Sequence, residues 1–295
     1  MEKITIVVPS LNQEKFIPNL LTSLKRQTFQ DFKVLVIDSY SSDNSVKLFK
    51  EYEKIEIINL KSTGEQACIH GFNLAKSKYL MHMCTSDFYP LDTWLEAAFE
   101  KLEKDNELSM VWSNAIQVNE KGKFTSIWRP EFFISPPPKK IRYFPYWFSD
   151  SYLPELNYCV HTKVFQHCIS DLKEAKLKYN NIGVLNYFIY NFTKNGYLQE
   201  YIPHLGHAGR THYNQIQSRS AQKNLDQNDD YYLRKLKLTY LKSLILKKET
   251  HVFRNSNFEV IKTFSIFNIY ILMLMILVKK IGYLKTRFIL KYNLI

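Results

Sequence analysis

Cysteine is sparse in this sequence and follows no recognisable pattern. The chain of 295 residues contains only Cys68, Cys84, Cys159 and Cys168, with no Cys-X-X-Cys pair and no metal-ligand spacing with histidine. This argues against a disulfide framework or a zinc site, and we expect free thiols in a reducing compartment. The amino terminus lacks the basic region, long apolar core and small-residue cleavage site of a signal peptide, so we predict action in the cytoplasm.

Acidic residues are also in deficit. The 28 Asp and Glu stand against 40 Lys and Arg, which gives a formal net charge of +12. A surplus of positive charge indicates an anionic partner such as a nucleotide phosphate, a phospholipid surface or a nucleic acid. The lysines crowd toward the C-terminal region without a recognisable reading motif, so no nucleic-acid partner is expected.

No apolar run is long enough for a comfortable membrane span, which takes roughly 20 residues. The segment 264–278, FSIFNIYILMLMILV, is shorter than that and is followed by several lysines and an arginine. We expect a basic, apolar helix lying on the inner face of the cytoplasmic membrane, because apolar burial and attraction to anionic lipid act together. The alternative is a helix packed against the rest of the protein.

Strand and helix patterns alternate along the first part of the chain. Continuous apolar runs predict strands at 4–8, 33–37, 55–60 and 79–83, with amphipathic stretches between them. The fold class is therefore α/β, with a mostly parallel central sheet and flanking helices. Asp43 and Asp92 are predicted to cap two of the helices, which run through Tyr52 and Lys104. A strand at 110–112 is followed by a predicted hairpin whose turn is 119–122 and whose second strand is 124–128.

Polar side chains follow several of these strands at the edge where ligands bind in open α/β sheets. Pro9 and Ser10 end the first strand, Asp38 ends the second, and Ser86 and Asp87 follow the fourth. The carboxylate of Asp38 can accept hydrogen bonds from a nucleobase or ribose. Capping the next helix is its alternative role, which Asp43 fits better. An acid at Asp87 can hold a divalent cation that bridges two phosphates.

The order and spacing of these features resemble a known family. The run ITIVVPSLNQEKFIPNLLTSLKRQTFQDFKVLVIDSYSSDNS, residues 4–45, closely resembles the opening of family 2 glycosyltransferases. Residues 64–80 resemble the next block of that family, and Thr85-Ser86-Asp87 stands where its metal-binding Asp-X-Asp is expected. The resemblance implies a GT-A fold, a nucleotide diphosphate sugar as donor, and a reaction that inverts the anomeric centre.

The resemblance also implies roles for individual residues. A Mg²⁺ or Mn²⁺ ion would be held by Asp87 and by His212, the favoured member of a cluster with His204 and His207. The donor would be contacted by Pro9, Ser10, Asp38, Gly64, Gln66, Ser86, Asp87 and Arg210. Three departures weaken the match to the family: Ser39 and Thr85 stand where relatives carry a second carboxylate, and Phe88 replaces an acid.

The general base of the family has no counterpart at the expected place. The matching stretch 180–186 contains no carboxylate. Asp150, within an aromatic loop expected to stack on acceptor sugars, is the preferred base, with Glu155 and Asp171 as alternatives. An asparagine cannot serve as a base at neutral pH.

We therefore predict a nucleotide-sugar-binding half at 1–115, an acceptor-side half at 116–222 and a basic, helical extension at 223–295. The predicted activity is inverting transfer of a sugar to a glycan or lipid-linked acceptor, in bacterial surface polysaccharide synthesis. The alternative is a catalytically degenerate GT-A domain that binds nucleotide or glycan without turnover.

Overall fold

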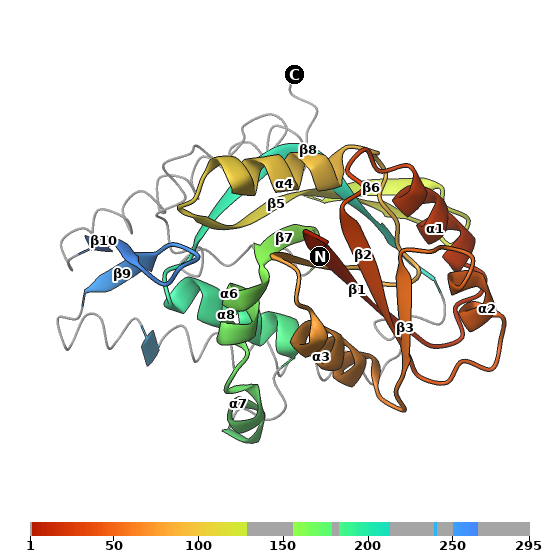
Figure 1. The fold of residues 1–295 in the computed structure, drawn as a ribbon, viewed down its shortest axis with the longest axis horizontal. Coiled ribbons are helices and arrows are strands. Elements are labelled where there is room, and N and C mark those ends of the chain that lie inside the picture. The colour runs from red at the N-terminus through yellow and green to blue at the C-terminus, as the bar shows by residue number, and fades with distance from the viewer. Residues whose placement is uncertain (1, 129–155, 179–182, 213–238, 241–249, 265–295) are drawn as a thin grey trace, which may run out of the picture.

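A computed structural model describes residues 2–128, 156–178, 183–212, 239–240 and 250–264 (Figure 1). These residues form one eight-stranded mixed sheet with helices on both faces, and a separate two-stranded hairpin. The strands are β1 (Ile4–Ser10), β2 (Phe32–Asp38), β3 (Ile55–Asn59), β4 (Tyr79–His82), β5 (Leu108–Val118), β6 (Phe124–Trp128), β7 (Tyr158–His161), β8 (Leu198–Arg210), β9 (His251–Arg254) and β10 (Val260–Phe264). The helices are α1 (Ile17–Lys25), α2 (Ser45–Phe49), α3 (Gly64–Leu74), α4 (Trp94–Lys104), α6 (Thr162–Cys168), α7 (Leu172–Lys178) and α8 (Val184–Lys194).

The sheet has a parallel half and a mixed half. Strands β3, β2, β1 and β4 are neighbours in that order and all run parallel. Strand β7 lies antiparallel between β4 and β5, β6 forms a hairpin with β5, and β8 pairs with β5 in parallel. The predicted α/β class and the parallel arrangement of the first four strands are confirmed, as is the β5–β6 hairpin.

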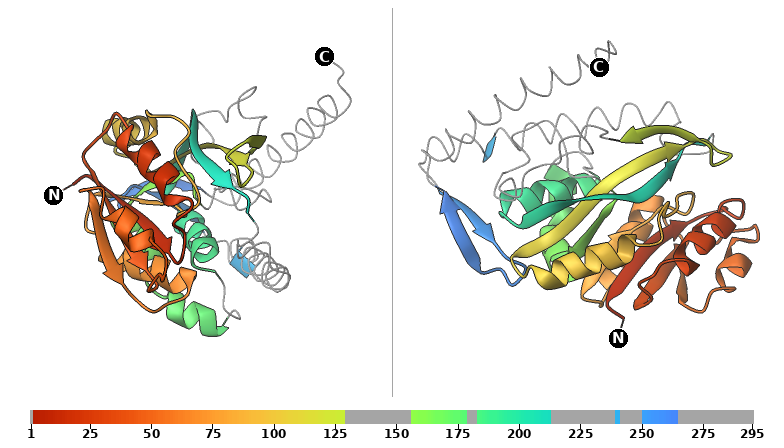
Figure 2. Two further views of the ribbon diagram at one scale, coloured as in Figure 1. Left: turned by 90° about the vertical axis from the view of Figure 1, so that its right-hand side faces the viewer. Right: turned by 90° about the horizontal axis from the view of Figure 1, so that it is seen from above.

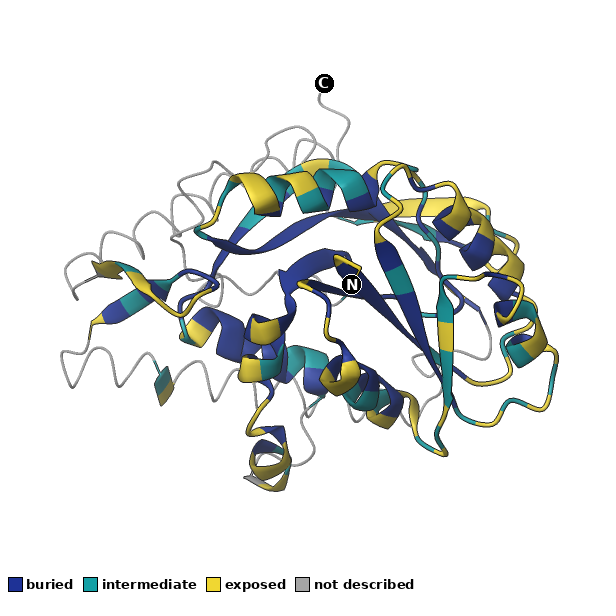
Figure 3. Cartoon of the chain, viewed as in Figure 1, coloured by how far each residue is buried: buried dark blue, intermediate teal, exposed yellow. Residues whose placement is uncertain are grey.

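Two hydrophobic cores cover the two faces of the sheet, because side chains of a strand alternate between its faces. Val7 of β1 packs with α3, α6 and α8, while Ile6 and Val8 pack on the other face with α1 and α4. All three side chains are fully buried. Figure 3 shows the consequence, with dark, buried strands between helices whose outer faces are exposed.

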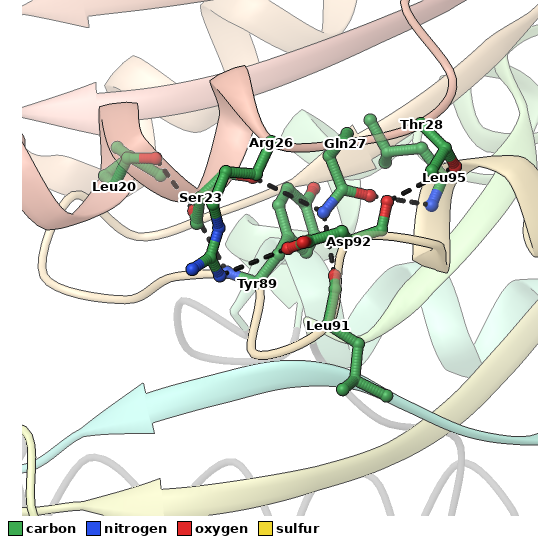
Figure 4. Close-up of polar contacts among 9 residues, drawn as sticks. All are labelled: Leu20, Ser23, Arg26, Gln27, Thr28, Tyr89, Leu91, Asp92 and Leu95. Carbon is green, nitrogen blue, oxygen red and sulfur yellow. Dashed lines mark hydrogen bonds and ion pairs between the residues drawn. The ribbon is translucent and has the colours of Figure 1, made fainter.

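The loop after β4 is fastened to the end of α1 by buried polar contacts (Figure 4). Gln27 is 2% exposed, donates to the carbonyl oxygen of Leu91 at 2.8 Å and accepts the backbone N–H of Leu95 at 3.1 Å. Ser23 accepts the backbone N–H of Tyr89 at 3.2 Å. The loop that leads from Asp87 to α4 therefore has a fixed path.

Two predicted helix caps differ from the structure. Asp92 does not cap α4: the N-cap residue is Thr93, and the Asp92 carboxylate pairs with the Arg26 guanidinium at 3.1 Å. Helix α2 is shorter than predicted and its N-cap residue is Asn44, although an Asp43 oxygen still accepts the Ser45 N–H at 2.9 Å. In both cases the N-cap residue lies one position later than predicted.

The far end of the described chain contains strands that the sequence analysis did not predict. Strands β9 and β10 form an antiparallel hairpin, which lies away from α1 and α2 in Figures 1 and 2. The predicted amphipathic helix at 226–248 falls outside the described residues except for 239–240, and the apolar segment after Phe264 also falls outside them. Within the described part of the chain, no helix is long and apolar enough to cross a membrane.

Candidate functional site

The carboxyl ends of β1, β2 and β4 are joined by short hydrogen bonds. Ser10 is the register partner of Asp38, and its carbonyl oxygen accepts the Ser39 N–H at 2.9 Å. The Thr85 hydroxyl donates to the carbonyl oxygen of Pro9 at 2.7 Å. Three segments distant in sequence thus form one rigid edge, where a ligand of an open parallel sheet is bound.

Asp38 is fully buried at this edge. One of its oxygens accepts the Ser41 N–H at 2.8 Å and the other accepts the Ser41 hydroxyl at 2.6 Å. These bonds fold the chain after β2 into a tight turn, in which Tyr40 adopts a φ of 60°. This left-handed conformation is costly for a residue with a bulky side chain. The Tyr40 side chain stays on the surface, with 63% of the residue exposed.

The loop after β1 is cross-linked to the loop after β2. Asn12, which also has a positive φ of 51°, accepts the Ser42 N–H at 2.8 Å, and its own N–H donates to the Ser41 hydroxyl at 2.9 Å. The Glu14 carboxylate accepts the Asn44 N–H at 2.8 Å. The two loops therefore hold each other in place. In the same region the Ser10 hydroxyl is buried with no hydrogen-bond partner among the described residues.

Asp87 is 4% exposed, and donors from two elements surround its carboxylate. One oxygen accepts the backbone N–H of Arg210 at 2.9 Å and the Ser86 hydroxyl at 3.2 Å. The other lies 3.1 Å from His207 Nε2. That nitrogen must carry a proton to donate to the carboxylate, which leaves Nδ1 unprotonated when the ring is neutral. His207 and Arg210 therefore fix the orientation of the Asp87 carboxylate.

Strand β8 reaches Asp87 because Gly206 allows its backbone to approach Ser113 and Trp94 closely. A Cβ on Gly206 would lie 2.3 Å from the Ser113 hydroxyl and 2.7 Å from the Trp94 ring. The Gly206 N–H instead donates to that hydroxyl at 3.0 Å. Two residues after Gly206, Ala208 exchanges backbone hydrogen bonds of 3.2 and 2.9 Å with Phe88, which join the loop after β4 to β8.

Arg210 is also held within the protein, with 4% of the residue exposed. Its guanidinium lies 5.3 Å from the ring of Phe16 and 5.5 Å from that of Phe88. Nε donates to the carbonyl oxygen of Ser86 at 2.8 Å, and Nη1 donates to that of Glu120 at 2.9 Å. Burial lowers the Arg210 pKa from its ordinary value, and the negative charge of Asp87 opposes that shift. The side chain fastens the β5–β6 turn to the loop that carries Asp87.

Two further histidines lie close to this carboxylate. His212 is 8% exposed and its ring centre is 4.7 Å from that of Phe16. Burial lowers the His212 pKa, an effect opposed by Glu120 and by Asp87. His82 at the end of β4 is 4% exposed, and burial together with the nearby His207 lowers its pKa to about 4. His82 is therefore neutral at physiological pH. Its Nε2 lies 3.3 Å from the sulfur of Cys68.

The other predicted site residues lie in different surroundings. Gly64 and Gln66 are exposed at the start of α3, where the Gln66 side chain accepts the Thr63 N–H at 2.9 Å as part of a capping box. Asp150 and Glu155 lie outside the described residues. Asp171 is exposed just before α7.

The structure thus brings together most of the predicted donor-contacting residues and adds some that the sequence did not single out for these positions. Pro9, Ser10, Asp38, Ser86, Asp87, Arg210 and His212 gather at one edge of the sheet. Phe16, His82 and the direct contact of His207 with Asp87 were not predicted. The cluster of His204, His207 and His212 was the only sequence signal for His207, and the prediction favoured His212 instead.

Known proteins resemble this chain in sequence and in fold. A family model described as Glycosyl transferase family 2 matches residues 5–157. An uncharacterized glycosyltransferase, MJ1057, of Methanocaldococcus jannaschii is 25% identical over 136 residues, which is 43% of this chain and 47% of that protein. Poly(ribitol-phosphate) beta-N-acetylglucosaminyltransferase TarS of Staphylococcus aureus is 28% identical over 108 residues, 33% of this chain and 18% of that protein.

The resemblance in fold extends further along the chain. The crystal structure of S. aureus TarS 1–349 in complex with UDP-GlcNAc superposes with a TM-score of 0.56, covering 84% of this chain and 76% of that one at 14% identity. At so low an identity the likeness concerns the fold alone, and it confirms the predicted GT-A architecture. The matched stretches span less than half the length of the two curated relatives.

Proposed function

The chain belongs to glycosyl transferase family 2, and on that premise we propose that it is an inverting glycosyltransferase. It transfers a sugar from a nucleotide diphosphate sugar to a glycan or lipid-linked acceptor in surface polysaccharide synthesis. The observation that carries the proposal is the joined edge of β1, β2 and β4, where the buried carboxylates of Asp38 and Asp87 follow parallel strands.

The nucleoside part of the donor is assigned to the ends of β1 and β2 and the start of α3. Asp38 accepts hydrogen bonds from the base or ribose, with Pro9 and Ser10 beside it at the same edge. We assign Gly64 and Gln66, which are exposed at the start of α3, to contacts with the nucleoside from that helix. The unpartnered Ser10 hydroxyl supports this assignment, because a buried polar group without a partner is costly unless a ligand satisfies it. The complex of TarS with UDP-GlcNAc supports a uridine diphosphate sugar as donor.

The diphosphate is assigned to the loop that carries Ser86 and Asp87. Arg210 supplies positive charge beside this loop, although its Nε and one Nη donate to carbonyl oxygens of the protein. We assign its main role to holding the loop. A carboxylate whose orientation is already fixed loses little freedom when it holds a cation against the leaving diphosphate, and this preorganisation favours the transition state.

A divalent cation fits these residues only together with the donor. Among the described residues, no group of three or more His, Cys, Asp or Glu side chains could hold a metal. Asp87 and His212 are close enough for the charge of Asp87 to act on the His212 pKa. Mg²⁺ commonly takes one or two carboxylates and completes its shell with phosphate oxygens. We therefore assign Mg²⁺ or Mn²⁺ to Asp87 and His212, where it would neutralise charge on the leaving diphosphate.

Asp150 remains the proposed general base, and the acceptor is a glycan or lipid-linked glycan at the inner face of the membrane. The names of relatives support a surface polymer as acceptor, since TarS is named for poly(ribitol phosphate).

A degenerate, non-catalytic GT-A domain is the second candidate. The three hydrogen-bond donors around Asp87 favour this candidate. They occupy the carboxylate that an active enzyme would present to the nucleotide sugar. Release of nucleoside diphosphate from donor without acceptor separates the two: an enzyme releases it slowly, and a binding domain does not.

Donor binding is tested by thermal shift of the purified chain with UDP, GDP and CMP, each with Mn²⁺, with Mg²⁺ and with EDTA. A ligand that binds only the folded state raises the melting temperature by mass action. We expect a shift with UDP that EDTA reduces. A shift that EDTA leaves unchanged would remove the metal from the account, and no shift with any nucleotide would contradict the proposal.

Tyr40 offers a test of the nucleoside side. Its exposed ring and left-handed backbone are expected to serve base stacking, which is worth about 1–3 kcal/mol for aromatic side chains. Tyr40→Gly removes the ring and the backbone strain together, so stability should hold or rise while UDP binding weakens about tenfold. Tyr40→Phe keeps the ring and should bind UDP like the wild type. Equal UDP affinity in the glycine variant, measured by calorimetry, would show that the ring takes no part.

A further inference from the structure

A cavity lies at the opposite edge of the sheet from the donor site. It has a volume of about 640 Å³ and is lined by the segment before β4, the ends of α3 and α4, the start of α6 and the β9–β10 turn. The donor edge lies at the other end of β1, a strand of seven residues. At about 3.3 Å per residue the two sites are roughly 20 Å apart, so the cavity is not part of the donor site.

Lysine ammonium groups dominate the charge of this cavity. Lys76, Lys78 and Lys163 line it together with one acid, Glu103. Lys78 lies 2.7 Å from a Glu103 oxygen, so these two charges compensate each other. Lys163 lies 2.7 Å from the side-chain oxygen of Asn257, which is a neutral partner. Two positive charges, those of Lys76 and Lys163, therefore have no matching acid among the residues that line the cavity.

A buried histidine in the wall adds no charge of its own. His161 is 6% exposed and its pKa is lowered to about 4, mainly by burial and then by Lys78 and Lys163. The ring is neutral at physiological pH and presents one donor and one acceptor nitrogen. The positive charge of the cavity therefore comes from the lysines.

The rest of the wall is polar and partly fixed. Asn73, Asn106 and Ser256 contribute amide and hydroxyl groups. Gln166 donates to the carbonyl oxygens of Phe72 and Ala75 at 2.9 and 3.1 Å, which joins α6 to the end of α3. The lining includes no Phe, Tyr or Trp, so it offers no stacking surface for a nucleobase. Amides and hydroxyls around an uncompensated positive charge suit hydroxyl groups that carry a phosphate.

We propose that this cavity binds the phosphate ester of a polyol or sugar, with Lys76 and Lys163 at the phosphate and the amide side chains at the hydroxyls. The ligand can be a free monoester or one repeat of a phosphodiester polymer, because both present the same groups. The site is independent of the donor site and does not depend on the function proposed above.

The test is calorimetric binding to the full chain with glycerol 3-phosphate as probe, alongside glycerol, inorganic phosphate and a diglycerol phosphodiester. We expect glycerol 3-phosphate or the diester to bind more tightly than glycerol or inorganic phosphate. Tighter binding of glycerol 3-phosphate would identify a free monoester as the ligand, and tighter binding of the diester would identify a repeat of a phosphodiester polymer. The double variant Lys76→Ala and Lys163→Ala should bind at least tenfold more weakly. Its thermal shift with UDP should match that of the wild type, since neither lysine lies at the donor edge.

Lys33→Ala is the matched control, because Lys33 pairs with Glu56 at 3.1 Å on another part of the sheet and does not line the cavity. It should bind the probe like the wild type. Binding by the double variant within twofold of the wild type would overturn the proposal. So would inorganic phosphate that binds as tightly as both esters, or no heat from either ester at millimolar concentration.

Discussion

Asp87→Asn is expected to lower sugar transfer by about 10³-fold, the order of effect seen when one stabilising group is removed from a preorganised site. The amide keeps the size of the side chain and can still accept the Arg210 N–H, so the fold should persist. It has no charge with which to hold a cation against the diphosphate. Release of nucleoside diphosphate, measured under steady state with saturating donor, gives the size of the loss.

Asp92→Asn is the control for this experiment. Asp92 lies in the same loop, but its carboxylate pairs with Arg26 at the surface, with side chains 53% and 46% exposed for Arg26 and Asp92. It should retain turnover close to that of the wild type. Full activity in the Asp87 variant would take that residue out of the mechanism and leave the diphosphate without an assigned partner.

Arg210→Met is expected to lower the free energy of unfolding by about 3 kcal/mol, because removal of one buried charged partner leaves the others unsatisfied. The carbonyl oxygens of Ser86 and Glu120 would lose their donor, and Asp87 would lose a neighbouring positive charge. Arg210→Lys should not restore stability, since one ammonium cannot reproduce the fork of donors that reaches two segments. Urea unfolding measures both variants.

Arg26→Met provides the matched comparison, because Arg26 also pairs with an acid but on the surface. Exposed pairs contribute about 0.2–1 kcal/mol, so the loss should be small. A loss of stability in Arg210→Met no larger than that in Arg26→Met would mean that Arg210 does not hold the β5–β6 turn and the Asp87 loop together.

The parallel half of the fold was predictable because its signals are local. Continuous apolar runs such as 4–8 and 33–37 are typical of strands buried on both faces, and β1 and β2 match them closely. The positions of Asp38 and Asp87 follow from strand ends for the same reason. The predicted cap at Asp92 was wrong: Thr93 is the N-cap residue of α4, and the Asp92 carboxylate pairs with Arg26, 66 positions earlier in the chain.

The far side of the site was not predictable from local patterns. Strand β8 is 13 residues long, and its sequence LQEYIPHLGHAGR mixes histidines, glycines and a proline without a clear alternation. Its contact with Asp87 joins residues 120 positions apart, through His207. The close packing of Gly206 on Trp94 that permits this contact depends on the assembled sheet. The sequence therefore singled out the cluster of His204, His207 and His212, but it favoured His212 as the metal ligand and did not predict the contact of His207 with Asp87.

The most direct test of the donor site is hydrogen exchange of the backbone amides, measured by mass spectrometry with and without UDP. Binding at the joined edge should slow exchange in the loops at 10–14, 38–45 and 85–88 and at the start of α3. The cavity at the opposite edge, including residues 76–78 and 161–163, should exchange at the same rate in both samples. Protection confined to that opposite edge, or none in the three loops at saturating UDP, would contradict the placement of the donor.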